Sequence, residues 1–79
     1  MKITLRAARV NKNLSMEEAA KQIQEKIESN GITTRRVTKD VVFNWERGIS
    51  YPNVVQVKAI EDVYGVSYND LIFYPENTI

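Results

Sequence analysis

The side chains best suited to chemistry in this sequence lie between Thr38 and Gly48. Lysine, asparagine and aspartate can read the edges of DNA bases, whereas arginine and threonine suit phosphate groups. At helical spacing one face of this segment carries Lys39, Asp40, Phe43, Asn44 and Arg47. These types and their grouping predict a surface that reads bases and phosphates. The alternative is a solvated surface helix, which also carries such residues.

A helix has to hold these side chains, and the sequence supplies its start, its end and its buried face. Thr38 can cap the N-terminus, and Gly48 can take the left-handed conformation that closes a helix. Val41, Val42 and Trp45 recur at helical spacing on the opposite face. The segment therefore predicts a helix of roughly three turns with Trp45 at the centre of the core.

Four further helices are predicted around this one, each after a residue that can cap it. The second start is the clearest, because Ser15 and Glu18 match a capping box. The predicted ranges are 5 to about 11 after Thr4, 16 to about 29 after Ser15, 54 to about 64 after Asn53, and a short fifth helix, 68–73, after Ser67. The helix after Asn53 is expected to bury Val54, Val57, Ile60 and Tyr64. The predicted fold class is all-α, a small bundle of five helices.

Five separated motifs follow one another over nearly the whole chain. They are Leu5-Arg6-Ala7-Ala8-Arg9, the stretch 14–20, Val37-Thr38 leading into Asn44-Trp45-Glu46-Arg47-Gly48, then Tyr51-Pro52, and finally Tyr64-Gly65-Val66-Ser67 with Asp70-Leu71. Together they resemble the lambda-repressor-like, Cro-type helix-turn-helix family, also called the XRE family. The resemblance implies a sequence-specific regulator of transcription, a repressor of the phage or mobile-element kind. Its expected partner is a double-stranded DNA operator, bound as a homodimer with helix 38–48 in the major groove.

The resemblance also implies roles for individual residues. Base contacts fall on Lys39, Asp40 and Asn44, and backbone contacts fall on Thr38, Arg47 and the turn that contains Ser50 and Tyr51. Arg9 and Glu46 match a structural salt bridge between the first and third helices. Phe43 is a candidate base contact through a thymine methyl group. Its alternative is partial burial against Arg47 or the loop.

One stretch, residues 24–36, departs from the family pattern. The usual turn between the second and third helices has three or four residues, whereas about twelve extra residues lie here between Ile23 and Val37. Helical spacing continues to Ile27, which predicts a longer second helix that ends at Asn30 and Gly31. Arg35 and Arg36 in the remaining connection are candidate DNA-backbone contacts. The alternative is that they keep an exposed loop soluble.

Composition narrows the function classes further. The 79 residues include no cysteine and no histidine, so the usual zinc ligands and histidine bases are absent, and no cofactor or metal is expected. The chain is predicted as one domain, 1–73, with a tail, 74–79. Paired acids such as Glu17 and Glu18 point in different directions on a helix, so an enzyme is not expected. No apolar run reaches the length of a membrane span and no signal region is evident, so a cytoplasmic location is expected.

The charge distribution says more than the net charge of +1. Residues 1–15 carry +4, 16–30 carry −2, 31–50 carry +2 and 51–79 carry −3. The basic segments are those that the resembled family turns toward DNA. The acidic C-terminal part and its apolar tail leave room for a second function, a protein-interaction module such as an antitoxin-like partner with the same fold.

Overall fold

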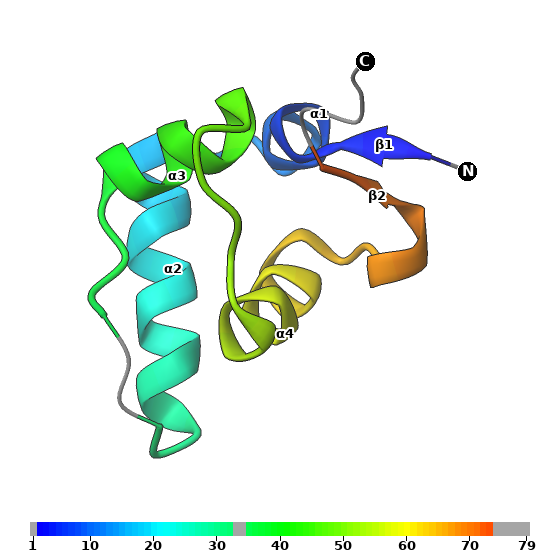
Figure 1. Ribbon diagram of the computed structural model, residues 1–79. Helices are drawn as coiled ribbons and strands as arrows, with labels where there is room; N and C mark the ends of the chain where they lie inside the picture. The colour runs from blue at the N-terminus through cyan, green and yellow to red at the C-terminus, as the bar shows by residue number, and fades with distance from the viewer. Residues whose placement is uncertain (1, 33–34, 74–79) are drawn as a thin grey trace.

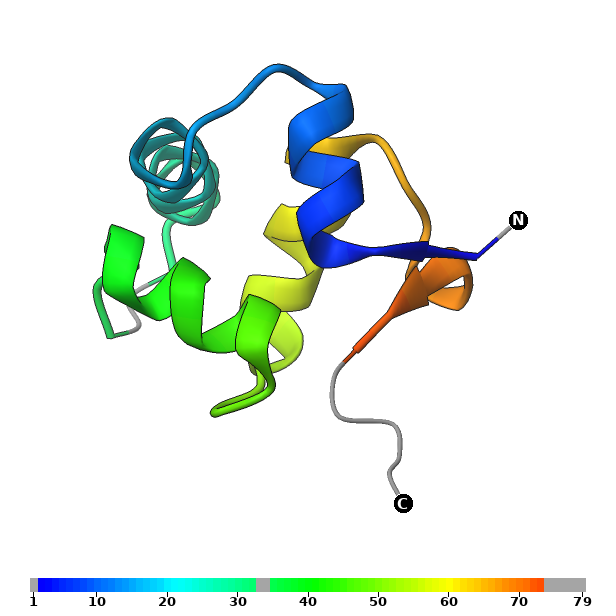
Figure 2. The same cartoon turned by 90° about the horizontal axis from the view of Figure 1, so that it is seen from above.

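The protein is a small helical bundle closed by a minimal β-sheet. The computed structural model describes residues 2–32 and 35–73. The order of elements is β1 (Ile3–Thr4), α1 (Leu5–Asn11), α2 (Met16–Ser29), α3 (Lys39–Arg47), α4 (Val54–Tyr64), a 3-10 turn η1 (Tyr68–Asp70) and β2 (Leu71–Ile72). In Figure 1, α3 lies across the upper end of α2, with α4 below and α1 to the right. Seen from above, α2 lies on one side of the bundle and α1 with α4 on the other (Figure 2).

The four α-helices begin where the sequence predicts them, because a capping side chain accepts a backbone N–H at each start. Thr4 accepts from Ala7 at 3.1 Å, and Ser15 accepts from Glu18 at 3.0 Å. The Glu18 carboxylate accepts the N–H of Ser15 in return, at 2.9 Å, which completes the predicted capping box. A second capping box, between Asn53 and Gln56, has both bonds at 2.8 Å and was not predicted.

Trp45 lies in the core, as predicted, with 3% of its surface exposed. Its neighbours in the core are mainly aliphatic, and the largest fully buried side chains are Ile23, Ile27, Ile60 and Val42. Ala19 and Ala20 are also buried, and α2 packs against both α3 and α4. Val41, predicted to share the buried stripe of α3, is only partly buried against this core.

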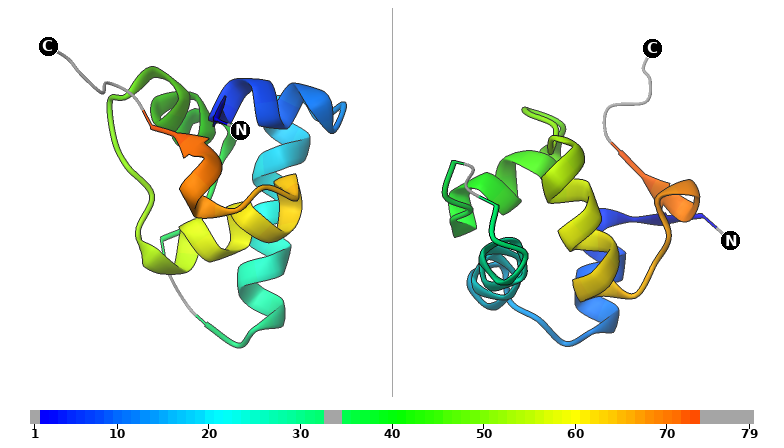
Figure 3. Two further views of the ribbon diagram at one scale, coloured as in Figure 1. Left: turned by 90° about the vertical axis from the view of Figure 1, so that its right-hand side faces the viewer. Right: turned by 90° about the horizontal axis from the view of Figure 1, so that it is seen from below.

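The predicted fifth helix is wrong. Residues 68–70 form a single 3-10 turn, and residues 71–72 form a strand that pairs in parallel with β1. Ser67 donates to the Asp70 carboxylate at 3.3 Å and makes no capping bond to the backbone. Ile72 and Phe73 favour extended structure, and the pairing of residues 71–72 with Ile3–Thr4 satisfies backbone groups that a helix would otherwise satisfy. Figure 3 shows η1 and β2 passing from the end of α4 to the start of α1.

The buried face of α4 also differs from the prediction. Val54 is 85% exposed and Val57 is only partly buried, whereas Ile60 and Tyr64 are buried as predicted. The buried face includes Gln56 and Ala59, which lie on the side of the helix opposite Val54. Val54 was wrongly assigned to the core because the polar Gln56 takes the inward position. The Gln56 side chain accepts the N–H of Asn53 there and so caps the start of α4.

The second helix continues as far as the sequence predicts. It ends at Ser29, and Gly31 follows with a φ of +72°, a backbone conformation that glycine adopts without strain. The N–H groups of Asn30 and Ile32 both donate to the carbonyl of Ile27, at 3.2 and 3.4 Å. The prolonged α2 is therefore closed by a regular turn. The predicted tail, 74–79, lies outside the described residues.

Candidate nucleic-acid interface

The helix α3 is oriented by what it buries. Val42, Trp45 and Glu46 face the bundle. The Thr38 hydroxyl accepts the N–H of Val41 at 3.4 Å, and Gly48 ends the helix with a φ of +76°. Because one face is fixed inward, the opposite face is presented to solvent at a defined rotation.

The structure brings the five predicted side chains together on that outward face. Lys39, Asp40, Phe43 and Arg47 are exposed, and Asn44 is partly buried beside them. The Arg47 guanidinium carbon lies over the Phe43 ring, 5.2 Å from its centroid. This distance is in the range of a cation–π contact, so the aromatic ring restrains the arginine. The face thus offers an ammonium, a carboxylate, an amide and a guanidinium within little more than two turns.

The loop after α3 is exposed. Ile49, Ser50 and Tyr51 are exposed, and the carbonyl of Asn44 accepts the N–H groups of Ile49 at 2.9 Å and Ser50 at 3.4 Å. These bonds fold the loop back onto the end of the helix. Ser50 and Tyr51 therefore lie on an exposed turn, three and four residues after Arg47.

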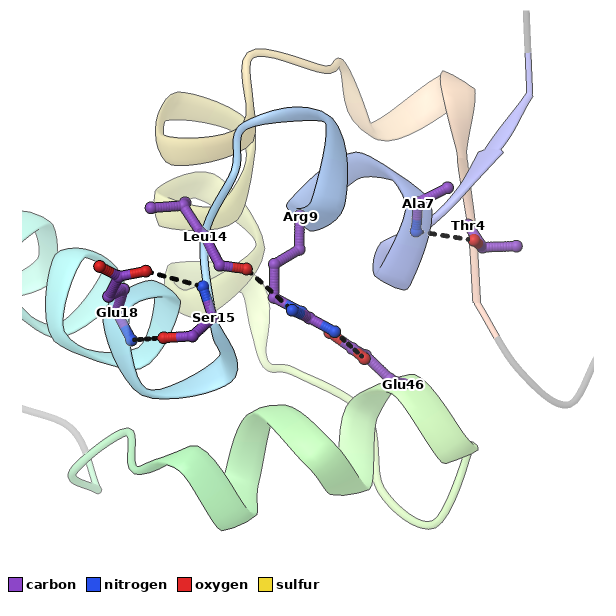
Figure 4. Close-up of polar contacts among 7 residues, drawn as sticks. All are labelled: Thr4, Ala7, Arg9, Leu14, Ser15, Glu18 and Glu46. Atoms are coloured by element: carbon purple, nitrogen blue, oxygen red, sulfur yellow. Dashed lines mark hydrogen bonds and ion pairs between the residues drawn. The ribbon is translucent and has the colours of Figure 1, made fainter.

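Arg9 and Glu46 tie α1 to the C-terminal half of α3. The Arg9 Nε donates to Glu46 Oε2 at 2.6 Å, and Nη2 donates to Oε1 at 3.2 Å. The two side chains are only 9% and 3% exposed, and Arg9 Nη1 also donates to the carbonyl of Leu14 at 2.8 Å (Figure 4). The hydrogen bond to Glu46 raises the pKa of Arg9, and burial raises the pKa of neighbouring Tyr64. The pair is a structural tie with no solvent-facing reactive group.

A second tie, which the sequence interpretation missed, holds the segment just before α3. Gln24 of α2 is buried, and its Oε1 accepts the N–H of Val37 at 2.8 Å. Its Nε2 donates to the Glu28 carboxylate at 3.1 Å. The position of Gln24 between Ala20 and Ile27 on the apolar face of α2 was the available signal, since a polar residue there has to find partners.

A groove of about 560 Å³ between α2 and the start of α3 is mixed in charge. Its charged lining consists of the acids Glu17, Glu25, Glu28 and Asp40 and the bases Lys21, Arg36 and Lys39. Arg35 and Arg36 are exposed in the connection, and Arg36 lies 3.9 Å from the Glu28 carboxylate. Neighbouring acids weaken the attraction of this groove for a phosphate.

The described part of the chain contains no cluster of three or more acidic, histidine or cysteine residues that could hold a metal ion. None of its helices is long and apolar enough to cross a membrane.

An α2–α3 pair that packs closely and exposes a polar face of α3 defines the helix-turn-helix class. The family model described as Helix-turn-helix (HTH_3) matches residues 5–71. The chain therefore belongs to this family, the lambda-repressor-like, Cro-type or XRE helix-turn-helix proteins, which are DNA-binding regulators of transcription. Searches of curated proteins and of solved structures returned no match.

Proposed function

We propose that this protein is a sequence-specific repressor of the phage or mobile-element kind that binds double-stranded DNA. The observation that carries the proposal is the outward face of α3, where polar and cationic side chains gather while Val42, Trp45 and Glu46 fix the opposite face inward. An α-helix fits the major groove of B-form DNA, and its first turns reach the base edges. A bound protein that overlaps a promoter then excludes the polymerase.

Within this proposal the residues divide into two groups. Lys39, Asp40 and Asn44 read bases, because lysine suits guanine, asparagine suits adenine and aspartate accepts from the cytosine amino group. The second group contacts the phosphate backbone without reading sequence, and its members are Thr38, Arg47, Arg35, Arg36, Ser50 and Tyr51. Phe43 lies between the groups, with its ring under the Arg47 guanidinium.

Selection of binding sites from random duplexes tests the function directly. A defined consensus is expected for the wild-type protein, and enrichment of no sequence would refute sequence-specific binding. Asn44→Ala and Lys39→Ala should each weaken the best site by about 1–3 kcal/mol and relax one or two positions of the consensus. Arg47→Ala should weaken all sequences alike and reduce the salt slope by about one unit. Lys58→Ala removes an exposed cation of α4 and serves as the control for Lys39→Ala.

The protein is further proposed to bind as a homodimer. One domain of this size reads only a few base pairs, and two half-sites about 34–36 Å apart multiply the specificity. Footprinting should show a protected site with two-fold symmetry, and titration should saturate at two chains per duplex. A single chain at saturation on an asymmetric site would contradict the dimer.

A second candidate function, a protein-interaction module such as an antitoxin-like partner, is favoured by one observation. An apolar groove of about 530 Å³ begins at Tyr51 in the loop after α3 and is lined by Tyr51, Pro52, Val54, Val57, Tyr68 and Phe73. Exposed apolar grooves of this kind are often binding surfaces. Val54→Lys should then abolish copurification of a partner from the native host and leave the DNA consensus unchanged. If Val54→Lys instead reduces the stoichiometry on DNA, the groove serves the homodimer.

A further inference from the structure

The start of α3 cannot be positioned by a tight turn in this protein. In the compact helix-turn-helix motif a connection of three or four residues fixes one helix against the next. Here residues 30–38 separate the end of α2 from the start of α3. A longer connection restricts its two ends less, so another contact has to set where α3 begins.

The side chain of Gln24 supplies that contact. It reaches from the middle of α2 to the backbone N–H of Val37, two residues before α3, and accepts it at 2.8 Å. Gln24 is 9% exposed, and the Val37 side chain is buried in the core. A buried N–H left without an acceptor is costly, so this bond favours one position of the segment strongly over others.

The rest of the Gln24 amide is also engaged. Its Nε2 donates to Glu28, one turn further along α2, which fixes the rotation of the amide and leaves Oε1 aimed at Val37. A second contact of this connection, between Arg36 and Glu28, is weaker. Its atoms lie 3.9 Å apart and the side chains are 74% and 58% exposed, where water and salt screen the attraction.

We propose that Gln24 is the positioning residue of the DNA-reading helix and takes the place of the tight turn. The inference rests on the proposed function, since it concerns how α3 is aimed at bases. Lys39 and Asp40 follow Val37 most closely in the chain, so their base contacts depend most on this bond. Contacts of Arg47 with phosphate depend on it less, because the far end of α3 is held separately by Arg9 and Glu46.

A matched pair of variants tests the proposal. Gln24→Met keeps the length of the side chain and removes the acceptor. Gln56→Met does the same in α4, where an equally buried glutamine, 7% exposed, accepts the N–H of Asn53 at the same distance of 2.8 Å. The measurement is the ratio of the dissociation constants for a scrambled duplex and for the selected site, at a temperature where both variants are folded.

Gln24→Met should lower this ratio about tenfold, the loss expected when one base-edge contact is misplaced, whereas Gln56→Met should leave it unchanged. The double exchange Gln24→Glu with Glu28→Gln should restore most of the ratio. It keeps an acceptor at position 24 for Val37 and moves the amide donor to position 28. If the wild-type protein discriminates between the two duplexes but Gln24→Met and Gln56→Met give equal ratios, the positioning role of Gln24 is refuted. The proposed function is not affected by that result.

Hydrogen exchange of the wild-type protein without DNA gives a test that needs no variant to fold. The Val37 amide should exchange as slowly as amides inside α2, because it is buried and bonded to a side chain. Exchange at the rate of an unprotected loop amide would overturn the proposal whatever the DNA measurements give. A wild-type protein that enriches no sequence would instead refute the proposed function, and the reading role of Gln24 with it.

Discussion

The two ends of α3 are held by different kinds of contact. Near its C-terminal end, a buried ion pair joins Glu46 to Arg9 of α1, with two hydrogen bonds between the side chains. Just before its N-terminal end, a single neutral hydrogen bond joins Val37 to Gln24 of α2. The charged tie lies near Arg47, which is proposed to contact phosphate, and the neutral tie lies near Lys39 and Asp40, which are proposed to read bases.

This difference has a physical consequence for both stability and recognition. A buried ion pair is stable only while both partners are present, because a single buried charge is expensive. A neutral hydrogen bond to an amide stabilises the fold less, but neither of its partners titrates. The comparison predicts that the C-terminal tie matters more for folding and the N-terminal tie more for sequence discrimination.

The largest expected effect comes from removing the side chain of Trp45, which packs in the core between the two ties. Trp45 is buried in the middle of α3, so Trp45→Ala should lower the free energy of unfolding by about 3–5 kcal/mol through loss of a large aromatic side chain. Denaturant titration followed by circular dichroism measures this loss. A wild-type fluorescence spectrum of fully water-exposed tryptophan would contradict the burial on which the prediction depends.

The next largest effect comes from breaking the salt bridge between Arg9 and Glu46. Arg9→Met should destabilise the protein by about 3 kcal/mol, since it leaves the Glu46 carboxylate buried without its partner. Arg9→Met combined with Glu46→Gln should recover part of the loss, because no buried charge is then left unpaired. Gln24→Met should cost less, about 1–2 kcal/mol, since it leaves only a neutral N–H without an acceptor. A larger loss for Gln24→Met than for Arg9→Met would reverse the comparison.

The salt bridge between Arg9 and Glu46 could be predicted from the sequence, whereas the hydrogen bond between Gln24 and Val37 could not. Arg9 and Glu46 each belong to a recognisable motif, and four helices carry local start signals such as Ser15 with Glu18. Local signals of this kind predict where α1, α2, α3 and α4 lie. The bond from Gln24 to Val37 joins residues thirteen positions apart across the connection between α2 and α3, where no local pattern applies.

The errors at the C-terminal end have the same origin. Residues 68–73 carry a helix-like start, but the pairing of β2 with β1 joins opposite ends of the chain and prevails over it. Val54 was assigned to the core by its apolar character, although the Asn53–Gln56 capping box turns Gln56 inward and Val54 outward. In both places a contact that depends on the folded chain outweighs the preference of single residues.

A smaller effect separates two roles of Phe43 on the outward face. If its ring chiefly restrains the Arg47 guanidinium, Phe43→Ala should weaken binding to all duplexes alike by about 0.5–1 kcal/mol, the size of an exposed cation–π contact. If the ring rests on a thymine methyl group, the consensus should change at one position. Site selection with Phe43→Ala and with the control Phe43→Leu, which keeps an apolar contact but no aromatic face, distinguishes these results.

The smallest effect concerns pH at the start of α2, beside the charged tie. The hydrogen bonds from the Ser15 backbone and hydroxyl lower the pKa of Glu18, an exposed carboxylate. Because the pKa is lower in the folded state, this stabilisation is complete above the ordinary glutamate pKa of about 4.3 and is lost as pH falls through the lowered value. Neither the Gln24 amide nor the Val37 N–H is itself a titrating group in this range.

Glu18→Gln provides the matched variant for this prediction, because glutamine also serves at the third position of a capping box and carries no titrating group. Thermal unfolding between pH 3 and pH 7 should show a smaller decline on acidification for Glu18→Gln than for the wild-type protein, and the two stabilities should approach each other at the acid end of this range, where Glu18 is protonated. Glu17→Gln, which removes an exposed carboxylate outside the capping box, should decline as the wild-type protein does. Identical pH profiles for Glu18→Gln and Glu17→Gln would mean that the capping carboxylate does not link folding to pH.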